Sequence, residues 1–231
     1  MTVSAARRYA AHGANSTDSS DASRRLIHGF CTAIALGVLA GCATTTSLPP
    51  PNTSAQAQST WRARAAELQS IQHFELHGRL LGLGVSAVRG DLNWAQDGER
   101  FDVRFFGPLG VGAVALSGRP DDLEVRTKDG TVRTGQPEAY MQQQLGWSLP
   151  LAGLRWWVLG APAPGSRPQV ELDGDGRALR LRQDGWEVSY IEYREVGQRA
   201  LPRKLELADS ERGFRLVIDD WGGLPLPGLP K

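Results

Sequence analysis

The sequence has few residues suited to covalent chemistry or metal binding. Its 231 residues include only two cysteines and four histidines. Cys31 lies within a short apolar segment near the N-terminus, and Cys42 directly follows that segment. Removal of this segment together with modification of Cys42 would leave no thiol for a disulfide, a metal site or a catalytic nucleophile.

An excess of charge is also missing. The chain has 26 Lys and Arg against 25 Asp and Glu, and no stripe of basic residues interleaved with aromatic ones. Nucleic-acid binding requires a cationic surface to neutralise phosphates. We therefore expect no nucleic-acid partner.

Catalytic and metal-binding motifs are absent as well. The sequence contains no G-x-S-x-G, no phosphate-binding loop and no H-E-x-x-H. His73 and His77 flank Glu75 on an expected strand, but no third ligand is near in sequence, so we interpret them as polar residues near a sheet edge. The DGDG segment at 173–176 lacks the distal ligands of a calcium loop and predicts a turn. We therefore expect that the protein is not an enzyme and that it binds neither a metal nor a cofactor.

No apolar run is long enough to span a membrane comfortably. The run at 26–40, LIHGFCTAIALGVLA, follows two arginines and ends in LAGC at 39–42. A basic region, a short apolar region and small residues are typical of a secretory signal peptide. Small residues before a cysteine resemble the bacterial lipobox, in which the cysteine is acylated and the signal is cleaved before it. The alternative is a buried helix with a free thiol. We expect a signal peptide over 1–41 and a lipidated Cys42.

The residues after Cys42 indicate location. Several acyl chains anchor a protein durably, and Ala43 stands where an Asp typically retains bacterial lipoproteins in the inner membrane. By that resemblance we expect a lipid-anchored protein on the periplasmic face of the outer membrane. Residues 42–59 are rich in Pro, Ser, Thr and Gln and predict an extended lipidated tether.

The rest of the chain predicts a β-rich domain. Thr60 is the expected N-cap of a short amphipathic helix over 61–72. Apolar and polar residues then alternate, which is typical of half-buried strands. Two short helices are expected at 137–147 and 151–160. The expected strands fall before and after these helices, at 73–84, 88–96, 100–106, 112–118, 122–127 and 131–134, then at 168–172, 178–183, 186–194, 201–208 and 213–219.

Turn residues such as Asp97-Gly98 and Asp184-Gly185 separate these strands and favour an antiparallel meander. About eleven strands should curl or close, because large twisted sheets do not stay flat. We expect one mainly β domain over 60–221, with the central helices as a lid across a barrel mouth. Residues 222–231 form a Pro-rich C-terminal tail without periodicity.

One turn has an unusual composition. Gly107, Pro108 and Gly110 form the expected bend after the strand at 100–106, and they leave Leu109 as the one large side chain there. An exposed leucine forgoes about 1.5–3 kcal/mol of burial, which a purely structural turn has no reason to do. We interpret Leu109 as a membrane-contact residue and the other three as its rigid scaffold.

Several segments together resemble the LolB family of outer-membrane lipoproteins. These are the W-x-Q of Trp94 and Gln96, the PLG turn at 108–110, and a segment with Gly146, Leu149-Pro150-Leu151, Leu154, Trp157 and Gly160. The resemblance covers roughly residues 60–221. It implies an unclosed eleven-stranded antiparallel barrel with a short helical lid over a hydrophobic cavity.

The resemblance also implies a function. Such a protein receives lipoproteins from the periplasmic carrier LolA, holds their acyl chains in the cavity and inserts them into the outer membrane, as a monomer and without a nucleotide. Leu109 maps to the protruding leucine of the family. The residues expected to line the cavity are Leu92, Trp94, Phe101, Val103, Phe105, Leu154, Trp157, Leu205, Leu207, Phe214 and Leu216.

Two other classes of protein stay open. A structural or assembly lipoprotein would use the barrel as a protein-interaction scaffold and would not bind acyl chains. A periplasmic lipid hydrolase is disfavoured because no nucleophile constellation is present.

Overall fold

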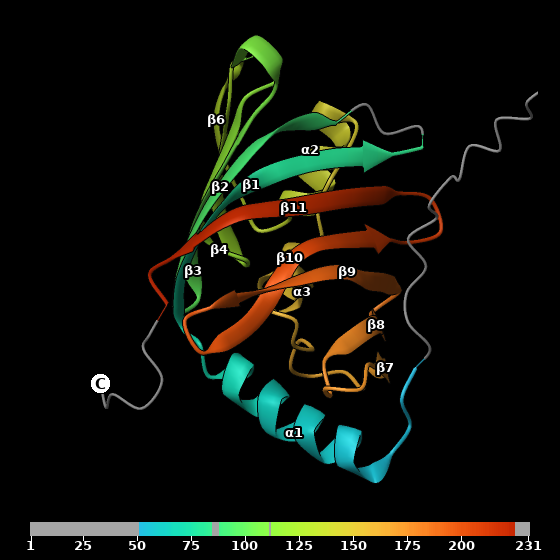
Figure 1. Ribbon diagram of the computed structural model, residues 1–231. Helices are drawn as coiled ribbons and strands as arrows, with labels where there is room; N and C mark the ends of the chain where they lie inside the picture. Colours follow the sequence, from blue (N-terminus) through green and yellow to red (C-terminus); the bar gives the residue numbers. More distant parts are fainter. Residues whose placement is uncertain (1–50, 85–87, 111, 225–231) are drawn as a thin grey trace, which may run out of the picture. The chain divides into compact units, whose positions relative to one another are not determined.

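The structure, a computed structural model, describes residues 51–84, 88–110 and 112–224 (Figure 1). The expected signal peptide, Cys42 and most of the C-terminal tail lie outside the described residues. The described residues all belong to one compact unit of the chain, Thr46–Lys231.

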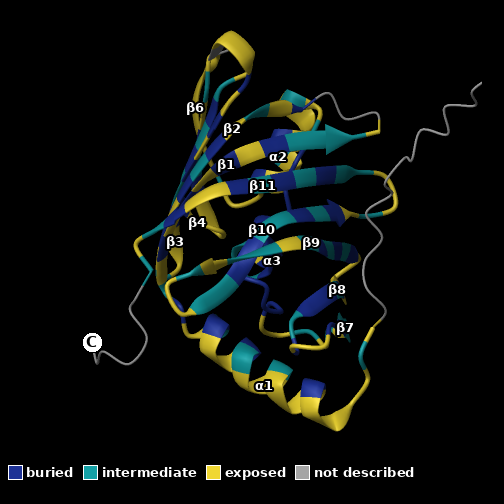
Figure 2. Ribbon diagram, viewed as in Figure 1, coloured by how far each residue is buried: buried dark blue, intermediate teal, exposed yellow. Residues whose placement is uncertain are grey.

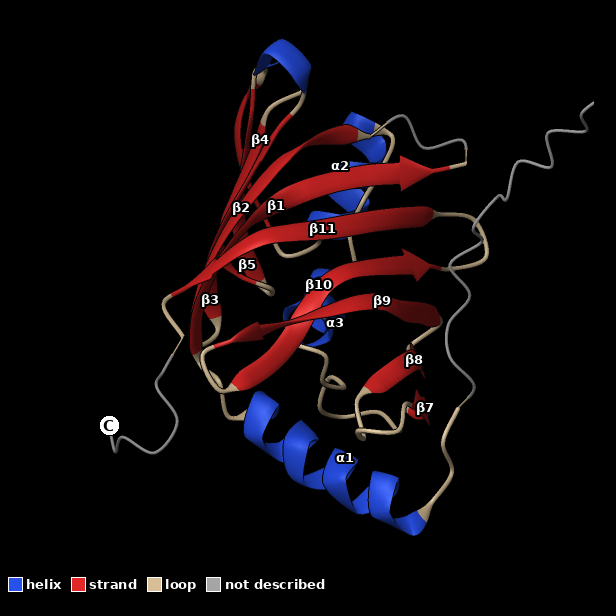
Figure 3. Ribbon diagram, in the orientation of Figure 1, coloured by secondary structure: helices blue, strands red, loops and turns tan. Residues whose placement is uncertain are grey.

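Eleven strands form one antiparallel sheet, which is strongly curved (Figure 3). Each falls where the alternation of apolar and polar residues predicts it. The strands are β1 (His73–Leu83), β2 (Arg89–Asp97), β3 (Arg100–Phe106), β4 (Val114–Arg119), β5 (Asp122–Thr127), β6 (Gly130–Thr134), β7 (Gln169–Leu172), β8 (Ala178–Gln183), β9 (Trp186–Val196), β10 (Arg199–Ala208) and β11 (Gly213–Gly222).

The order of the strands leaves the sheet open. It runs β6-β5-β4-β3-β2-β1-β11-β10-β9-β8-β7, so the first and last strands pair in the middle and β6 and β7 are the edges. The chain crosses from one edge to the other through α2 (Pro137–Leu145) and α3 (Leu151–Trp157). The expected unclosed antiparallel sheet of eleven strands is therefore confirmed.

The curvature gives the sheet two different faces. Along β1 and β3 every second residue is buried, because neighbouring side chains point to opposite sides of a strand (Figure 2). The inward residues form one hydrophobic cluster with residues of α2, α3 and the segment after α3. The central helices thus lie against the concave face and bury apolar side chains there.

Several helix boundaries differ from the expected ones, and α1 (Ala55–Gln69) and α2 end two or three residues earlier than expected. Helix α1 begins before Thr60, because the Ser54 hydroxyl accepts the Ala57 N–H at 3.1 Å and caps the helix. The last residues of the expected tether are therefore helical. Helix α3 ends at Trp157 instead of Gly160, and a turn follows it.

The pairing of β1 with β11 requires a glycine. The register of this pair shifts between His77 and Gly78, and a Cβ at Gly78 would overlap the Val217 carbonyl oxygen on β11. Any side chain at this position would therefore push the two central strands apart.

We expect Gly78→Ala to lower the free energy of unfolding by about 1–3 kcal/mol, the usual cost of forcing a methyl group into packed structure. Urea denaturation measures this change. Gly174→Ala is the matched control, because a Cβ at Gly174 meets nothing within 4 Å. Equal stability of the two variants would show that the close approach at Gly78 is unimportant.

Candidate functional site

The tip between β3 and β4 has a distinctive backbone. Its centre is a single 3-10 turn, η1 (Pro108–Gly110), which lies at the top of the molecule in Figure 1. Leu109 has φ 56° and ψ 24°, the left-handed region that leucine rarely adopts. Its side chain is fully exposed, and the neighbouring Phe106 is 40% exposed.

Both features of Leu109 cost free energy. The left-handed conformation costs on the order of 1–2 kcal/mol for a residue with a Cβ. Exposure forgoes the burial that a leucine normally gains. Pro108 is exposed and Gly107 is buried at the base of the tip. The turn holds an apolar side chain outward at a conformational cost, which is the geometry of a contact residue.

The residues expected to line a cavity come together on the concave face. All eleven are buried and belong to one hydrophobic cluster that joins the sheet to α3; they are Leu92, Trp94, Phe101, Val103, Phe105, Leu154, Trp157, Leu205, Leu207, Phe214 and Leu216. In the structure these side chains pack against one another. Their role in ligand binding stays a prediction.

An aromatic contact joins the tip to the segment between the helices. The Phe105 ring, near the end of β3, packs edge-to-face on Trp147 with the ring centroids 5.3 Å apart. Trp147 lies between α2 and α3. We call residues 137–163, which contain α2, α3 and the turn after α3, the covering segment. The base of the tip is therefore in direct contact with the covering segment.

Gln183 is an important residue that sequence reasoning missed. Its side-chain oxygen accepts the Trp157 indole N–H at 3.0 Å and the Ala163 N–H at 2.8 Å, and its amide donates to the Ala163 carbonyl at 2.8 Å. The Tyr190 hydroxyl donates to the Trp157 carbonyl at 3.0 Å. These bonds hold the end of α3 on the sheet. The available signal was a polar residue at an inward position, following Leu181 in the alternation of β8.

The W-x-Q segment has a structural explanation. The Trp94 indole donates to the Gln96 side-chain oxygen at 2.9 Å, and the Gln96 amide donates to the carbonyls of Gly98 and Arg100 at 2.8 and 3.1 Å. Gln96 is buried. One side chain therefore provides hydrogen-bond partners both for the buried indole N–H and for two carbonyls of the turn between β2 and β3.

A second polar network, also missed, holds the start of α3. The Leu151 N–H donates to Glu138 on α2 at 2.9 Å, and Arg212 donates to the Ser148 hydroxyl at 2.6 Å. Burial raises the pKa of the Glu138 carboxyl. The bond from Arg212 thus ties the segment between α2 and α3 to the turn between β10 and β11.

His73 and His77, which we interpreted as polar residues of a strand, both contact polar side chains. His73 lies 2.8 Å from Asp97, and His77 lies 2.8 Å from the Asn93 side chain. In the part of the chain that the structure describes, no group of three metal-ligating side chains is present. Within the same residues, no helix combines the length and the apolar character needed to cross a bilayer.

Comparison with known proteins adds independent support. The sequence profile described as "Outer membrane lipoprotein LolB" matches residues 72–221. The outer-membrane lipoprotein LolB of Pseudomonas paraeruginosa is 39% identical over 83% of this chain and 94% of its own length. The LolB of Nitrosococcus oceani is 41% identical over 81% and 94%.

Among solved structures, a LolA superfamily protein from Nitrosomonas europaea aligns over 75% of this chain and 94% of its own, with 15% identity and a TM-score of 0.45. The profile match and the identities to curated relatives cover most of the domain described above. The family so identified consists of lipoprotein-trafficking proteins and not of enzymes. The chain belongs to the LolB family of outer-membrane lipoproteins.

Proposed function

We propose that this protein receives lipoproteins from the periplasmic carrier LolA, holds their acyl chains against the concave face and inserts them into the outer membrane. It is anchored by lipid on Cys42 and faces the periplasm. Leu109 carries this proposal, because it is fully exposed and held in a left-handed backbone conformation. A tip that enters lipid regains the burial that Leu109 lacks in water.

The concave face supports the holding step. Its side chains are apolar and contiguous from the base of the tip to α3, which is the surface that an acyl chain requires. An acyl chain can reach them only if the covering segment moves away from the sheet. Helix α2 suits such movement, since Pro137 and Met141 are its only buried residues.

The direction of transfer needs no nucleotide in this scheme. Acyl chains pass from the carrier to the concave face because they bind it better, and from there to the bilayer at the tip. A ligand moves spontaneously toward the site of lower free energy. The phenylalanine and tryptophan contact at the base of the tip joins the holding surface to the point of release.

Replacing Leu109 by glutamate should abolish delivery while cargo uptake from LolA persists. The loss of about 1.5–3 kcal/mol of apolar burial predicts that transfer to liposomes falls tenfold or more, and the fully exposed site predicts an unfolding free energy within about 0.5 kcal/mol of the original. The measurement is the amount of lipoprotein that sediments with liposomes. Leu109→Met is the matched apolar control and should deliver normally. Normal delivery by Leu109→Glu would refute the role of the tip.

Acyl-chain binding should be visible in tryptophan fluorescence. Trp94 and Trp157 lie in the hydrophobic cluster, so a palmitoylated peptide should change the emission in a saturable manner. The same peptide without palmitate should produce no change. If both peptides behave alike, the scaffold alternative, in which no acyl chain binds, is the better description.

Cys42→Ala in a mature chain that is exported behind a signal peptide cleaved without lipidation should move the protein from the membrane fraction to the soluble fraction. A single acyl chain binds membranes reversibly, whereas several give a durable anchor, and all of them depend on the Cys42 thiol. Fractionation of cells that express the variant tests this expectation. Retention of the variant in the outer membrane would show that another feature anchors the protein.

A further inference from the structure

A groove lies on the outer face of the sheet directly beside the tip. Its volume is about 570 Å³. Arg104, Phe106 and Ala115 line it from the positions of β3 and β4 that alternate with the buried residues. The side chains that matter to its chemistry are Arg104, Phe106, Leu109, Ala115, Arg126 and Lys128.

The pairing of β3, β4 and β5 explains the groove. Arg104 on β3 is opposite Ala115 on β4, and Ala115 is opposite Arg126 on β5. Adjacent strands lie about 4.8 Å apart, so two arginines flank one small side chain. The groove exists because the outward residues of β4 near the tip are small while those of its neighbours are long.

Charge along these strands is sorted by distance from the tip. On β3, Arg104 lies nearer the tip than its partner Asp102, 3.1 Å away. On β5, Arg126 lies nearer the β5–β6 turn than its partner Glu124, 2.9 Å away. Both carboxylates belong to the next row back, where they flank Ser117. The cations therefore face the tip and the acids face away from it.

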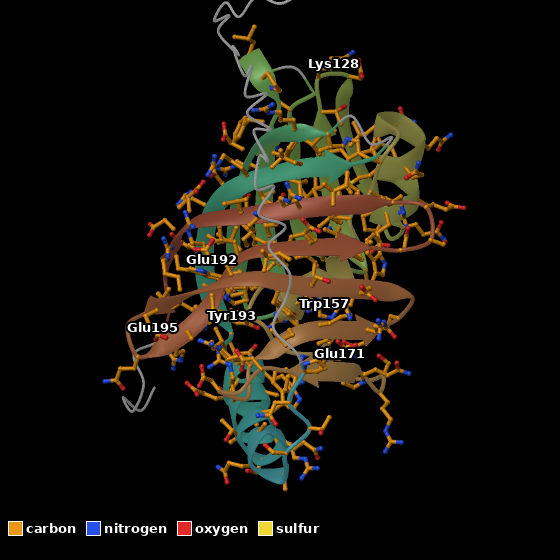
Figure 4. All side chains as sticks on the ribbon, turned by 45° about the vertical axis from the view of Figure 1, so that its right-hand side comes forward. Lys128, Trp157, Glu171, Glu192, Tyr193 and Glu195 are labelled. Carbon is orange, nitrogen blue, oxygen red and sulfur yellow. The ribbon has the colours of Figure 1, made fainter. Side chains whose placement is uncertain are left out.

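Lys128 extends the cationic side of the groove. It belongs to the turn between β5 and β6 and lies at the top of the molecule in Figure 4, the end at which η1 lies in Figure 1. Its ammonium group contacts Asp129 at 2.8 Å, and both side chains are highly exposed. The tip thus has apolar residues and cations at the same end of the molecule.

Arg104 and Arg126 can exchange their carboxylate partners for a ligand at little cost in free energy. Their side chains are 56% and 65% exposed for Arg104 and Arg126, and ion pairs at such positions contribute roughly 0–1 kcal/mol. A guanidinium binds a phosphate through two parallel hydrogen bonds. A phosphate placed between the two arginines would also lie over an apolar floor, which suits the glycerol and upper acyl region of a lipid.

We propose that this groove binds the phosphate headgroup of an anionic phospholipid in the target membrane. The proposal rests on the proposed function, because the approach of Leu109 to the bilayer brings the groove to the surface of the target membrane. Phe106 contacts the upper acyl region, Arg104 and Arg126 hold the phosphate, and Lys128 approaches the charged surface. The groove makes delivery selective for membranes with anionic lipid, and Leu109 supplies insertion without regard to headgroup.

The test is cosedimentation with vesicles of the mature chain, without residues 1–41 and with Cys42→Ala. One set contains phosphatidylcholine alone, and the other contains about one part phosphatidylglycerol in five. Each cation near an anionic surface contributes about fivefold in binding. The double variant Arg104→Gln/Arg126→Gln should therefore lose about twenty-five-fold in binding to the anionic vesicles and should bind the zwitterionic vesicles unchanged.

Two variants distinguish lipid binding in the groove from an effect of net charge or of the tip. Arg182→Gln/Arg203→Gln removes two arginines from the other half of the sheet, each paired with a carboxylate at 2.7 Å, and should change binding less than twofold. An equal loss in this control would mean that net charge, not the groove, binds lipid. Leu109→Ser removes the apolar side chain without adding a charge to the groove, which Leu109 also lines. It should weaken binding to both vesicles and keep the anionic preference. Loss of insertion at the tip and loss of headgroup binding in the groove therefore give different results.

Two further outcomes would overturn the proposal. If inorganic phosphate displaces the chain from anionic vesicles more effectively than chloride at equal ionic strength, the groove is a site for free anions. If the Arg104 and Arg126 double variant binds both vesicles normally but no longer takes cargo from LolA, the groove docks an acidic protein. Loss of the anionic preference in this double variant alone supports the lipid site.

Discussion

The antiparallel pairing of β1 with β11 is the interaction on which the rest of the structure depends. Six strands precede the central helices and five follow them, and this one pair joins the two groups into a single sheet. It needs the close backbone approach at Gly78. Because the first and last strands meet in the middle, the free edges are β6 and β7, and the segment between them must cross the concave face.

That crossing determines how the apolar face is covered. Instead of closing into a barrel, the sheet relies on α2, α3 and the following turn to shield its inner side chains from water. Specific polar contacts position the cover, with Gln183 holding the end of α3 and Glu138 its start. A cover held by a few bonds at its ends can separate from the sheet more easily than a paired strand, whose whole ladder of hydrogen bonds would break.

The energetically unfavourable features and the cationic groove lie together at the tip. Leu109 is exposed and held in an unfavourable backbone conformation, and the groove beside it is lined by Arg104 and Arg126. An apolar residue beside a groove with cations matches the membrane interface, where acyl chains lie beneath phosphates. Under the two proposals, the inner face of the sheet binds acyl chains and its outer face binds lipid headgroups.

The sequence by itself determined the strands, the position of the tip and the inward direction of Phe105, because alternation of apolar and polar residues is a local signal with a period of two. The exposed Leu109 was recognisable for the same reason. Tertiary structure alone decided that β1 pairs with β11, since turn residues specify only neighbouring strands. It also decided the bonds of Gln183 and the row of Arg104, Ala115 and Arg126, because these depend on contacts between segments whose register no local pattern encodes.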